Sequence, residues 1–348
     1  MAIVDKPSDF FNTLLYSGND GTGRSITGVG FQPDFVWIKD KSNDFKHGIF
    51  DVKRGVTKVV SSNSDSVEQT ISNSLTAFGT DGFTVGSNAL VNGNNNSYAS
   101  WNWKAGTAIS NNAGSPVGTS LASSGSVNTT AGFSVVTYIS NGNNYTVPHG
   151  LGVAPNVVIV KNRSIDKFWA VYHSSLGNTK ATFLDTTAAP DTDATYWQNT
   201  TPTSTVFSVG TNSGNNSGNA MVAYSFAEKI GFSKFGQFNG NSSDDGTFIY
   251  LGFKPAFVII KRTNSTGNWV MQDNKRSSSG GFNENSYSLY SNSTTDQITD
   301  ESELDLLSNG WKFRNALTDN NAAGSTYIYM AFAENPFVSS SGVPGLAR

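Results

Sequence analysis

The most constraining feature of this sequence is an eleven-residue phrase that occurs three times. Residues 29–39 read VGFQPDFVWIK, residues 151–161 read LGVAPNVVIVK, and residues 251–261 read LGFKPAFVIIK. Proline lacks a backbone donor and suits the start of a strand, and an unbroken apolar run is typical of a strand covered on both faces. The phrase therefore predicts one kind of buried strand three times, with Lys39, Lys161 and Lys261 reaching water at its end.

Two further motifs recur in the same order, which turns the three phrases into three complete units. DGFTVG at 81–86, TVFSVG at 205–210 and NGWKFR at 309–314 follow the phrase, and SYASWNWKA at 97–105, AMVAYSFAE at 220–228 and YIYMAFAEN at 327–335 close each unit. Self-similarity at a regular spacing is the sequence signature of repeat architectures. We expect the following organisation: an N-terminal segment with β-repeat 1 over 1–105, a Gly/Ser/Asn-rich linker over 106–132, β-repeat 2 over 133–230, β-repeat 3 over 231–337 and a C-terminal arm over 338–348.

The composition favours an all-β fold. The chain holds 35 glycines with many serines, threonines and asparagines, yet aromatic residues still reach 12%. Short strands joined by Gly/Asn turns produce this mixture, because strands take aromatic and β-branched residues while turns take Gly and Asn. We therefore predict three tandem β-sandwiches of jelly-roll-like character, and a barrel-like closure satisfies the same pattern. One helix is expected over 299–310, where Thr299 caps, acids fill the first turn and Gly310 follows the end.

Charge and cysteine content exclude several classes of protein. The net charge is −3 and only 14% of residues are charged, so no basic surface is expected to hold nucleic acid. Cysteine is absent, which removes disulfides, thiolate chemistry and cysteine-ligated zinc. No run of eighteen apolar residues occurs, so we expect no insertion into a membrane.

A search for reactive groups gives no catalytic pattern. His47, His149 and His173 lie at unrelated places in the units, without a second histidine at ligand spacing. The acidic pairs, at 191–193 and 244–245, each lie on one loop, whereas glycoside cleavage needs carboxylates on opposite sides of a cleft. The acids within 299–310 resemble a metal site or catalytic carboxylates, but helix-start electrostatics explain them at least as well. We predict no catalytic residue, no cofactor and no metal, and hence that the chain is not an enzyme.

Tyr196 and Trp197 are the only candidate contact residues for a ligand. They lie in DATYWQNTTPTS, outside the shared pattern and within a polar segment. Aromatic rings stack on the apolar faces of sugars while amides bind hydroxyls, so this pair is a candidate glycan contact. The alternative is that the two rings fill their own loop.

The repeated motifs also resemble a known family. DKPSDFFNTLLYSGN at 5–19 with RSITGVGFQPDFVWIK, HGLGVAPNVVIVKNRS at 149–164, and YIYMAFAENPF at 327–337 are similar to virion structural proteins of tailed bacteriophages of marine and cyanobacterial hosts. Proteins of this family are usually labelled tail fibre or structural protein. The similarity covers nearly the whole chain and all three units.

The resemblance implies a place in a phage particle. It implies a non-enzymatic tail fibre or receptor-binding component that contacts a host surface receptor, with glycans as candidate ligands, and that associates with other virion proteins. It also implies a homo-oligomer, with a trimer as the expected state. The alternatives are a capsid decoration, collar or adaptor protein, and a polysaccharide depolymerase ranked last.

Overall fold

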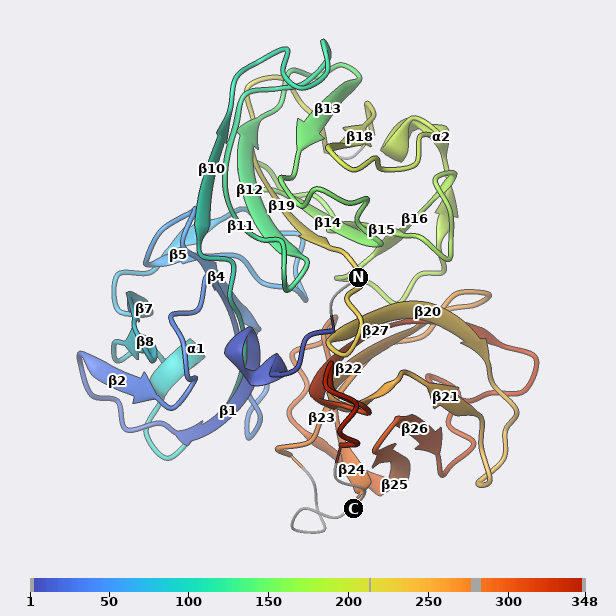
Figure 1. Cartoon of the computed structure of the whole chain (residues 1–348). Coiled ribbons are helices and arrows are strands. Elements are labelled where there is room, and N and C mark those ends of the chain that lie inside the picture. The colour runs from blue at the N-terminus through green and yellow to red at the C-terminus, as the bar shows by residue number, and fades with distance from the viewer. Residues whose placement is uncertain (1–2, 213, 277–282, 346–348) are drawn as a thin grey trace.

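A computed structural model describes residues 3–212, 214–276 and 283–345. The chain forms three β-rich lobes arranged around a common centre, one for each repeated unit (Figure 1). This confirms the predicted all-β class with three repeated sandwiches. Among the described residues, no helix has the length and apolar character needed to cross a bilayer.

Unit 1 places a four-stranded inner sheet, in the order β1-β9-β3-β4, against a smaller sheet in the order β2-β8-β7. Its elements are η1 (Pro7–Asp9), β1 (Phe11–Ser17), β2 (Arg24–Thr27), β3 (Phe35–Asp40), β4 (Gly48–Asp51), β5 (Lys58–Val59), β6 (Gln69–Thr70), β7 (Leu75–Gly79), β8 (Gly82–Val85), α1 (Ala89–Asn92) and β9 (Ser97–Trp103).

Unit 2 repeats the inner sheet as β12-β19-β14-β15, with β13 and β18 paired opposite it. Its elements are β12 (Phe133–Ile139), β13 (Tyr145–Pro148), β14 (Val157–Asn162), β15 (Ala170–His173), β16 (Lys180–Phe183), β17 (Asp191–Thr192), α2 (Ala194–Trp197), β18 (Val206–Val209) and β19 (Ala220–Phe226). The preceding residues 106–132, expected as a linker, instead contain β10 (Thr107–Asn111) and β11 (Ser123–Asn128), which extend this sheet beyond β12.

Unit 3 repeats the inner sheet as β20-β27-β22-β23 and continues from it into the opposite sheet, which gives one wrapped eight-stranded sheet. Its elements are β20 (Ser233–Asn239), β21 (Phe248–Tyr250), β22 (Phe253–Arg262), β23 (Trp269–Asp273), β24 (Glu284–Tyr290), β25 (Ile298–Leu307), β26 (Gly310–Phe313) and β27 (Thr326–Pro336). Pro255 lies at a register shift of β22, a position where its missing donor is tolerated.

The helix expected over 299–310 is wrong, because β25 occupies this segment. It pairs with β24 on one side and β26 on the other. Leu304 and Leu306 alternate into the core of unit 3, which is the period of a strand. The backbone hydrogen bonds to two neighbouring strands, together with the burial of the leucines, stabilise the strand more than the local capping residues would stabilise a helix. The side chains of 300–303, which include most of the acid cluster, lie outside the described residues.

The repeated phrase explains why the inner sheets need no polar face. Val36, Val158 and Val258 are each fully buried inside the sandwich core of their own unit, so the three copies have equivalent surroundings. The residues before them, at 35, 157 and 257, point the other way into one core shared by all three units. Successive strand residues face opposite sides of a sheet, so an apolar run covers both cores at once.

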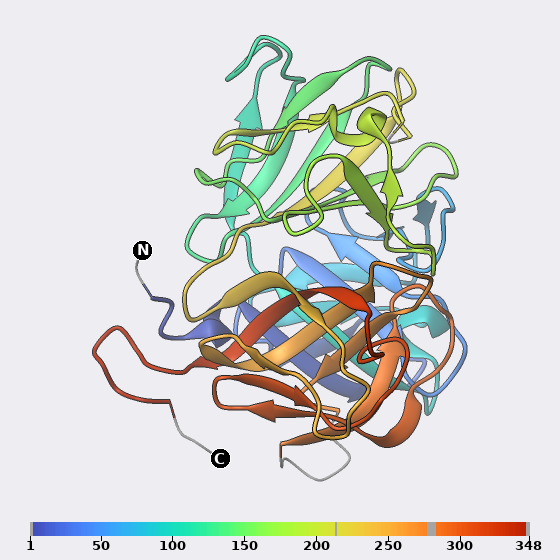
Figure 2. The ribbon, with the colours of Figure 1, turned by 90° about the vertical axis from the view of Figure 1, so that its right-hand side faces the viewer.

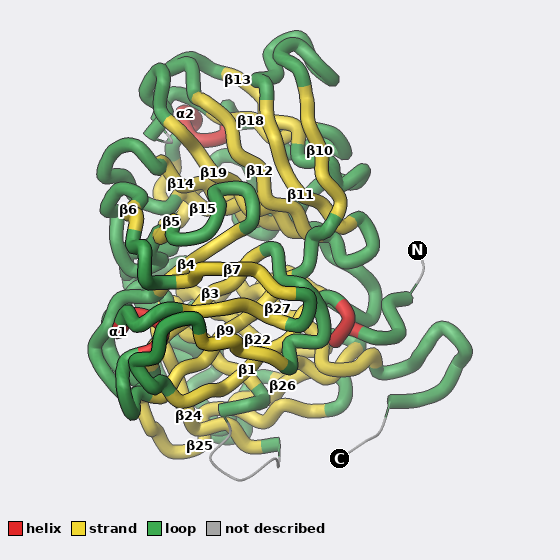
Figure 3. Tube along the Cα trace, turned by 90° about the vertical axis from the view of Figure 1, so that its left-hand side faces the viewer, coloured by secondary structure: helices red, strands yellow, loops and turns green. Residues whose placement is uncertain are grey.

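The shared core joins the inner sheets across the centre of the molecule. Phe11 of β1 stacks on Phe332 of β27 with ring centroids 5.4 Å apart, and Phe35 of β3 lies 4.6 Å from Tyr224 of β19. The inner strands of units 1 and 3 lie beside each other in Figure 3. Three sandwiches therefore bury their second faces against one another instead of exposing them to solvent.

Candidate functional site

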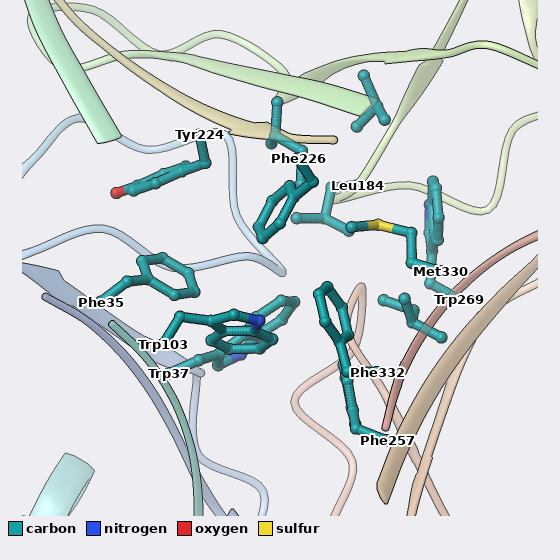
Figure 4. Close-up of a pocket in the computed structure, with 13 residues that line it drawn as sticks. Phe35, Trp37, Trp103, Leu184, Tyr224, Phe226, Phe257, Trp269, Met330 and Phe332 are labelled. Atoms are coloured by element: carbon teal, nitrogen blue, oxygen red, sulfur yellow. The ribbon is translucent and has the colours of Figure 1, made fainter. Parts of the chain in front are cut away.

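The centre of the molecule is the first candidate site, because side chains from all three units converge there (Figure 4). Phe35 and Trp103 come from unit 1, Phe226 from unit 2, and Phe257 and Phe332 from unit 3. The cavity that they border has a volume of only about 20 Å³. This is space for about one water molecule, and the apolar lining offers such a water few partners. The centre is a packed core rather than a ligand pocket.

Side chains at one repeated position form a hydrogen bond from each unit to a backbone carbonyl group of its neighbour, and we call these contacts ties. Strand register makes His47, Trp169 and Trp269 equivalent, since each stands four residues before the last residue of β4, β15 or β23. The indole nitrogen of Trp169 donates to Ser61 O at 2.9 Å, and that of Trp269 donates to Phe183 O at 2.7 Å.

His47 completes the same set of ties through its ring Nε2, which lies 3.1 Å from Tyr290 O. The three contacts run from unit 2 to unit 1, from unit 3 to unit 2, and from unit 1 to unit 3. The ties are therefore cyclic, as rotational symmetry between similar units requires. Trp169 and Trp269 thus fill the same structural position in units 2 and 3.

A second set of cyclic ties lies at the last residue of the same strands. The hydroxyl of Tyr224 donates to Asp51 Oδ2 at 2.8 Å, and the indole nitrogen of Trp101 donates to Asp273 Oδ2 at 3.0 Å. In unit 2 the equivalent residue is His173, whose Nε2 lies 3.1 Å from a backbone carbonyl oxygen of β27. Each junction between units thus holds one tie of each set.

Units 1 and 3 neutralise the buried aspartate of this position with an arginine three residues later. The Arg54 Nε atom lies 2.5 Å from Asp51 Oδ2, and Arg276 Nε lies 2.6 Å from Asp273 Oδ2, with all four side chains wholly buried. Unit 2 has no charge to neutralise there, and Leu176 stands where the arginine would be. An unpaired buried charge is costly, so aspartate and arginine occur together or not at all.

The lysines that end the repeated phrase are fully buried, which contradicts the expectation that water reaches them. Lys161 Nζ donates to Asp65 O of unit 1 at 2.5 Å, and Lys261 Nζ donates to Thr187 O of unit 2 at 2.9 Å. Lys39 Nζ donates to backbone oxygens of its own unit. Burial lowers the pKa of each of the three ammonium groups to about 8, opposed by nearby carboxylates. Backbone oxygen atoms, from a neighbouring unit for Lys161 and Lys261 and from its own unit for Lys39, take the place of water.

The three histidines are committed to the fold. In each ring Nδ1 accepts an N–H, from Trp37 to His47, from Leu151 to His149 and from a backbone amide to His173, while Nε2 faces a carbonyl oxygen. This arrangement fits the neutral ring with its proton on Nε2. Burial lowers the pKa of His47 to about 3 and those of His149 and His173 to about 4.

One acid of each acidic pair has a local structural partner. Asp193 caps α2, accepting from Thr195 N at 2.7 Å and from Asn212 Nδ2 at 2.6 Å. Asp245 pairs with Lys312 across the β21–β26 side of unit 3. Within the described residues, no three His, Asp or Glu side chains gather closely enough to hold a metal ion.

The predicted glycan contact residues lie at the outer end of unit 2. Trp197 is 2% exposed and its indole nitrogen donates to Lys180 O at 3.0 Å, so its ring fills the core of the unit. Tyr196 is 8% exposed and borders a surface hollow together with Phe168 and Phe183. A role of Tyr196 in glycan contact stays a prediction. Sequence reasoning missed Phe168. It could have been found by aligning the units, because the other two have a polar residue at this position.

Comparisons with known proteins place the chain in a family without assigning it an activity. No curated protein matches it, and no solved structure matches it. One family model, described as a domain of unknown function and designated DUF7483, matches residues 6–336 and so spans all three units. The chain therefore belongs to the DUF7483 family.

Proposed function

We propose that this chain is a non-enzymatic structural component of a tailed-bacteriophage particle, and most directly a tail fibre or receptor-binding component. The observation that carries the proposal is how buried polar groups are used. The histidines, the buried Asp–Arg pairs and the lysines of the repeated phrase hold units together or satisfy backbone groups. Such use suits a protein whose task is mechanical rather than chemical.

The closed arrangement of units supports a role in surface contact. The shared core and the two sets of cyclic ties hold three sandwiches as one body, while loops between strands remain on the outside. Loops on a rigid scaffold can vary and bind without disturbing the core. The resemblance to phage virion proteins over the three units supports the same conclusion.

The proposal includes association with other virion proteins and a homo-oligomer, with a trimer as the expected state. An adaptor or decoration protein on the capsid or collar is the second candidate. It is favoured by the position of both chain ends on one side of the molecule, which would leave the opposite side free (Figure 2).

The test is to locate the protein and to block its function. Antibodies against the recombinant chain should label particles of the phage that encodes it, and gold-labelled particles should show the label at the tail. The same antibodies, or an excess of the free protein, should reduce adsorption of particles to host cells. Label on the head without an effect on adsorption would support the decoration protein, and unlabelled particles would refute both candidates.

A further inference from the structure

The hollow beside Tyr196 is built at the junction of units 1 and 2. It has a volume of about 290 Å³ and its lining includes Asp65 of unit 1 and Asp166, Phe168, Phe183 and Tyr196 of unit 2. Ligand sites in proteins are commonly found where two domains meet, with an apolar surface and a few well-placed polar groups. The two questions are therefore whether the polar groups are held in place and whether the aromatic rings are available.

The polar wall is fixed by bonds across the junction. Asp65 O accepts from Lys161 Nζ at 2.5 Å and from the backbone N–H of Lys167 at 2.9 Å. The Asp166 carboxylate accepts the backbone N–H of Val67 at 2.9 Å through Oδ1. The segments that carry both acids are thus held by the neighbouring unit, and both acidic residues remain exposed. The Asp166 carboxylate is therefore a preorganised acceptor for hydroxyl groups, whereas Asp65 is positioned through its backbone oxygen.

The aromatic side of the hollow is a continuous row of three rings. The ring centroids of Phe168 and Phe183 are 5.6 Å apart, and those of Phe183 and Tyr196 are also 5.6 Å apart. Phe168 is 53% exposed, whereas the other two rings are nearly buried. The row therefore presents aromatic surface to solvent at its Phe168 end.

Phe168 has no counterpart in the other units. Phe168 directly precedes Trp169, and the residues that precede the equivalent His47 and Trp269 are Lys46 in unit 1 and Asn268 in unit 3, both polar. The fold of a unit therefore does not require an aromatic residue at this place, and about half of the Phe168 side chain remains open to solvent. The aromatic lining of the hollow is specific to unit 2.

We infer that this hollow binds the neutral pyranose ring of a host surface glycan, an inference that rests on the receptor-binding function proposed above. The aromatic row would stack on the apolar C–H face of the sugar, and the carboxylates of Asp65 and Asp166 would accept its hydroxyl protons. Two carboxylates and one ammonium group, that of Lys167, line the hollow, so an anionic sugar is disfavoured.

The experiment titrates the purified full chain with methyl α-D-glucopyranoside, methyl β-D-galactopyranoside and N-acetylglucosamine, with the methyl α-glycoside of N-acetylneuraminic acid (the sialylated sugar) as the anionic probe. Saturation-transfer NMR reports which sugar protons contact the protein. We expect saturable binding of at least one neutral sugar through its C–H face and none of the sialylated one. Binding of no neutral sugar, or preference for the anionic probe, would overturn the inference.

Three variants place the binding at this hollow. Phe168→Asn, which installs the residue that unit 3 carries, should weaken binding about two- to tenfold by removing the stacking surface. Asp166→Asn keeps an acceptor for Val67 N–H but loses the charge, and should weaken binding about fivefold. Phe45→Ala is the matched control, since Phe45 is an exposed aromatic residue of unit 1, 38% exposed, away from this lining. Equal affinity of Phe168→Asn and the wild type would refute the site.

Failure of the glycan-binding inference can be distinguished from failure of the proposed function. If particles carrying Phe168→Asn adsorb to host cells as well as the wild type, the hollow is refuted and the receptor-binding proposal stands. If the protein is not found in particles, the proposed function fails whatever the sugar titration gives.

Discussion

Replacing Arg54 with methionine tests whether the buried Asp–Arg pair stabilises the junction of units 1 and 2. The guanidinium group makes contacts at 2.5 Å to Asp51 Oδ2, at 2.8 Å to Ile49 O and at 3.2 Å to both Lys58 O and Glu68 Oε2. Methionine fills a similar volume but satisfies none of these oxygens. The Asp51 carboxylate would keep the Tyr224 hydroxyl and two backbone N–H donors but lose its countercharge.

The magnitude follows from the burial of the pair. Removing one partner of a wholly buried ion pair costs about 3–5 kcal/mol of unfolding free energy, because the other charge stays in a poorly solvated place. The double variant Asp51→Asn with Arg54→Met removes that charge, so it should recover about 2 kcal/mol of the loss. Arg314→Met is the matched control: its side chain is 38% exposed beside Asp305, and the expected loss is at most about 1 kcal/mol.

The assay is urea denaturation followed by tryptophan fluorescence and by far-ultraviolet circular dichroism. Unfolding free energies follow from linear extrapolation when the two probes give coincident transitions with an unchanged slope. A loss below about 1 kcal/mol for Arg54→Met, or a double variant less stable than the single one, would show that the ion pair does not stabilise the junction as argued.

Three further outcomes are expected. The free energy of unfolding should fall as the pH drops from about 6.5 towards 4, because His47, His149 and His173 have folded pKa values of about 3, 4 and 4, below the unfolded value. Each histidine contributes up to about 1.4 kcal/mol per pH unit. Urea denaturation curves at pH 7, 6 and 5 measure this loss of stability. Trp103→Ala should cost about 3–5 kcal/mol and lower one cooperative calorimetric transition for the whole chain, whereas separate transitions for the units would contradict the shared core. Gly310→Ala should destabilise or misfold unit 3, since the added Cβ would lie 2.0 Å from Ile249 O; a melting temperature equal to that of the wild type would contradict this close approach.

The sequence was sufficient to predict the units and the local surroundings of their strands. Val36, Val158 and Val258 occupy equivalent positions because the signal, an unbroken apolar run after a proline, is local. The centre of the molecule was not predictable in the same way. The hydrogen bond from Tyr224 to Asp51 joins residues 173 positions apart, and no local pattern links such a pair.

The incorrect predictions from the sequence have one physical cause. Segments distant in the sequence form contacts that a local pattern would assign to water or to a helix. The sequence predicts that Lys161 is an exposed residue at the end of a strand, but in the fold its Nζ atom donates to the carbonyl oxygen of Asp65 in unit 1. The segment 299–310 carries the signals of a helix start, yet β24 and β26 pair with it as a strand. Residues 106–132 look like a linker by composition but complete the edge of the unit 2 sheet. Of the candidate site, Tyr196 could be predicted, whereas the contribution of Asp65 required knowledge of how the units pack.

The two ends of the described chain meet, which has a consequence for how the molecule could arise and be rebuilt. The Asp5 carboxylate accepts from the backbone N–H of Ser340 at 2.6 Å, and the adjacent Val4 N donates to Ile230 O, at the junction of units 2 and 3, at 3.0 Å. The described polypeptide thus returns close to its starting place. A circularly permuted gene, opened at any exposed turn, would encode the same set of contacts.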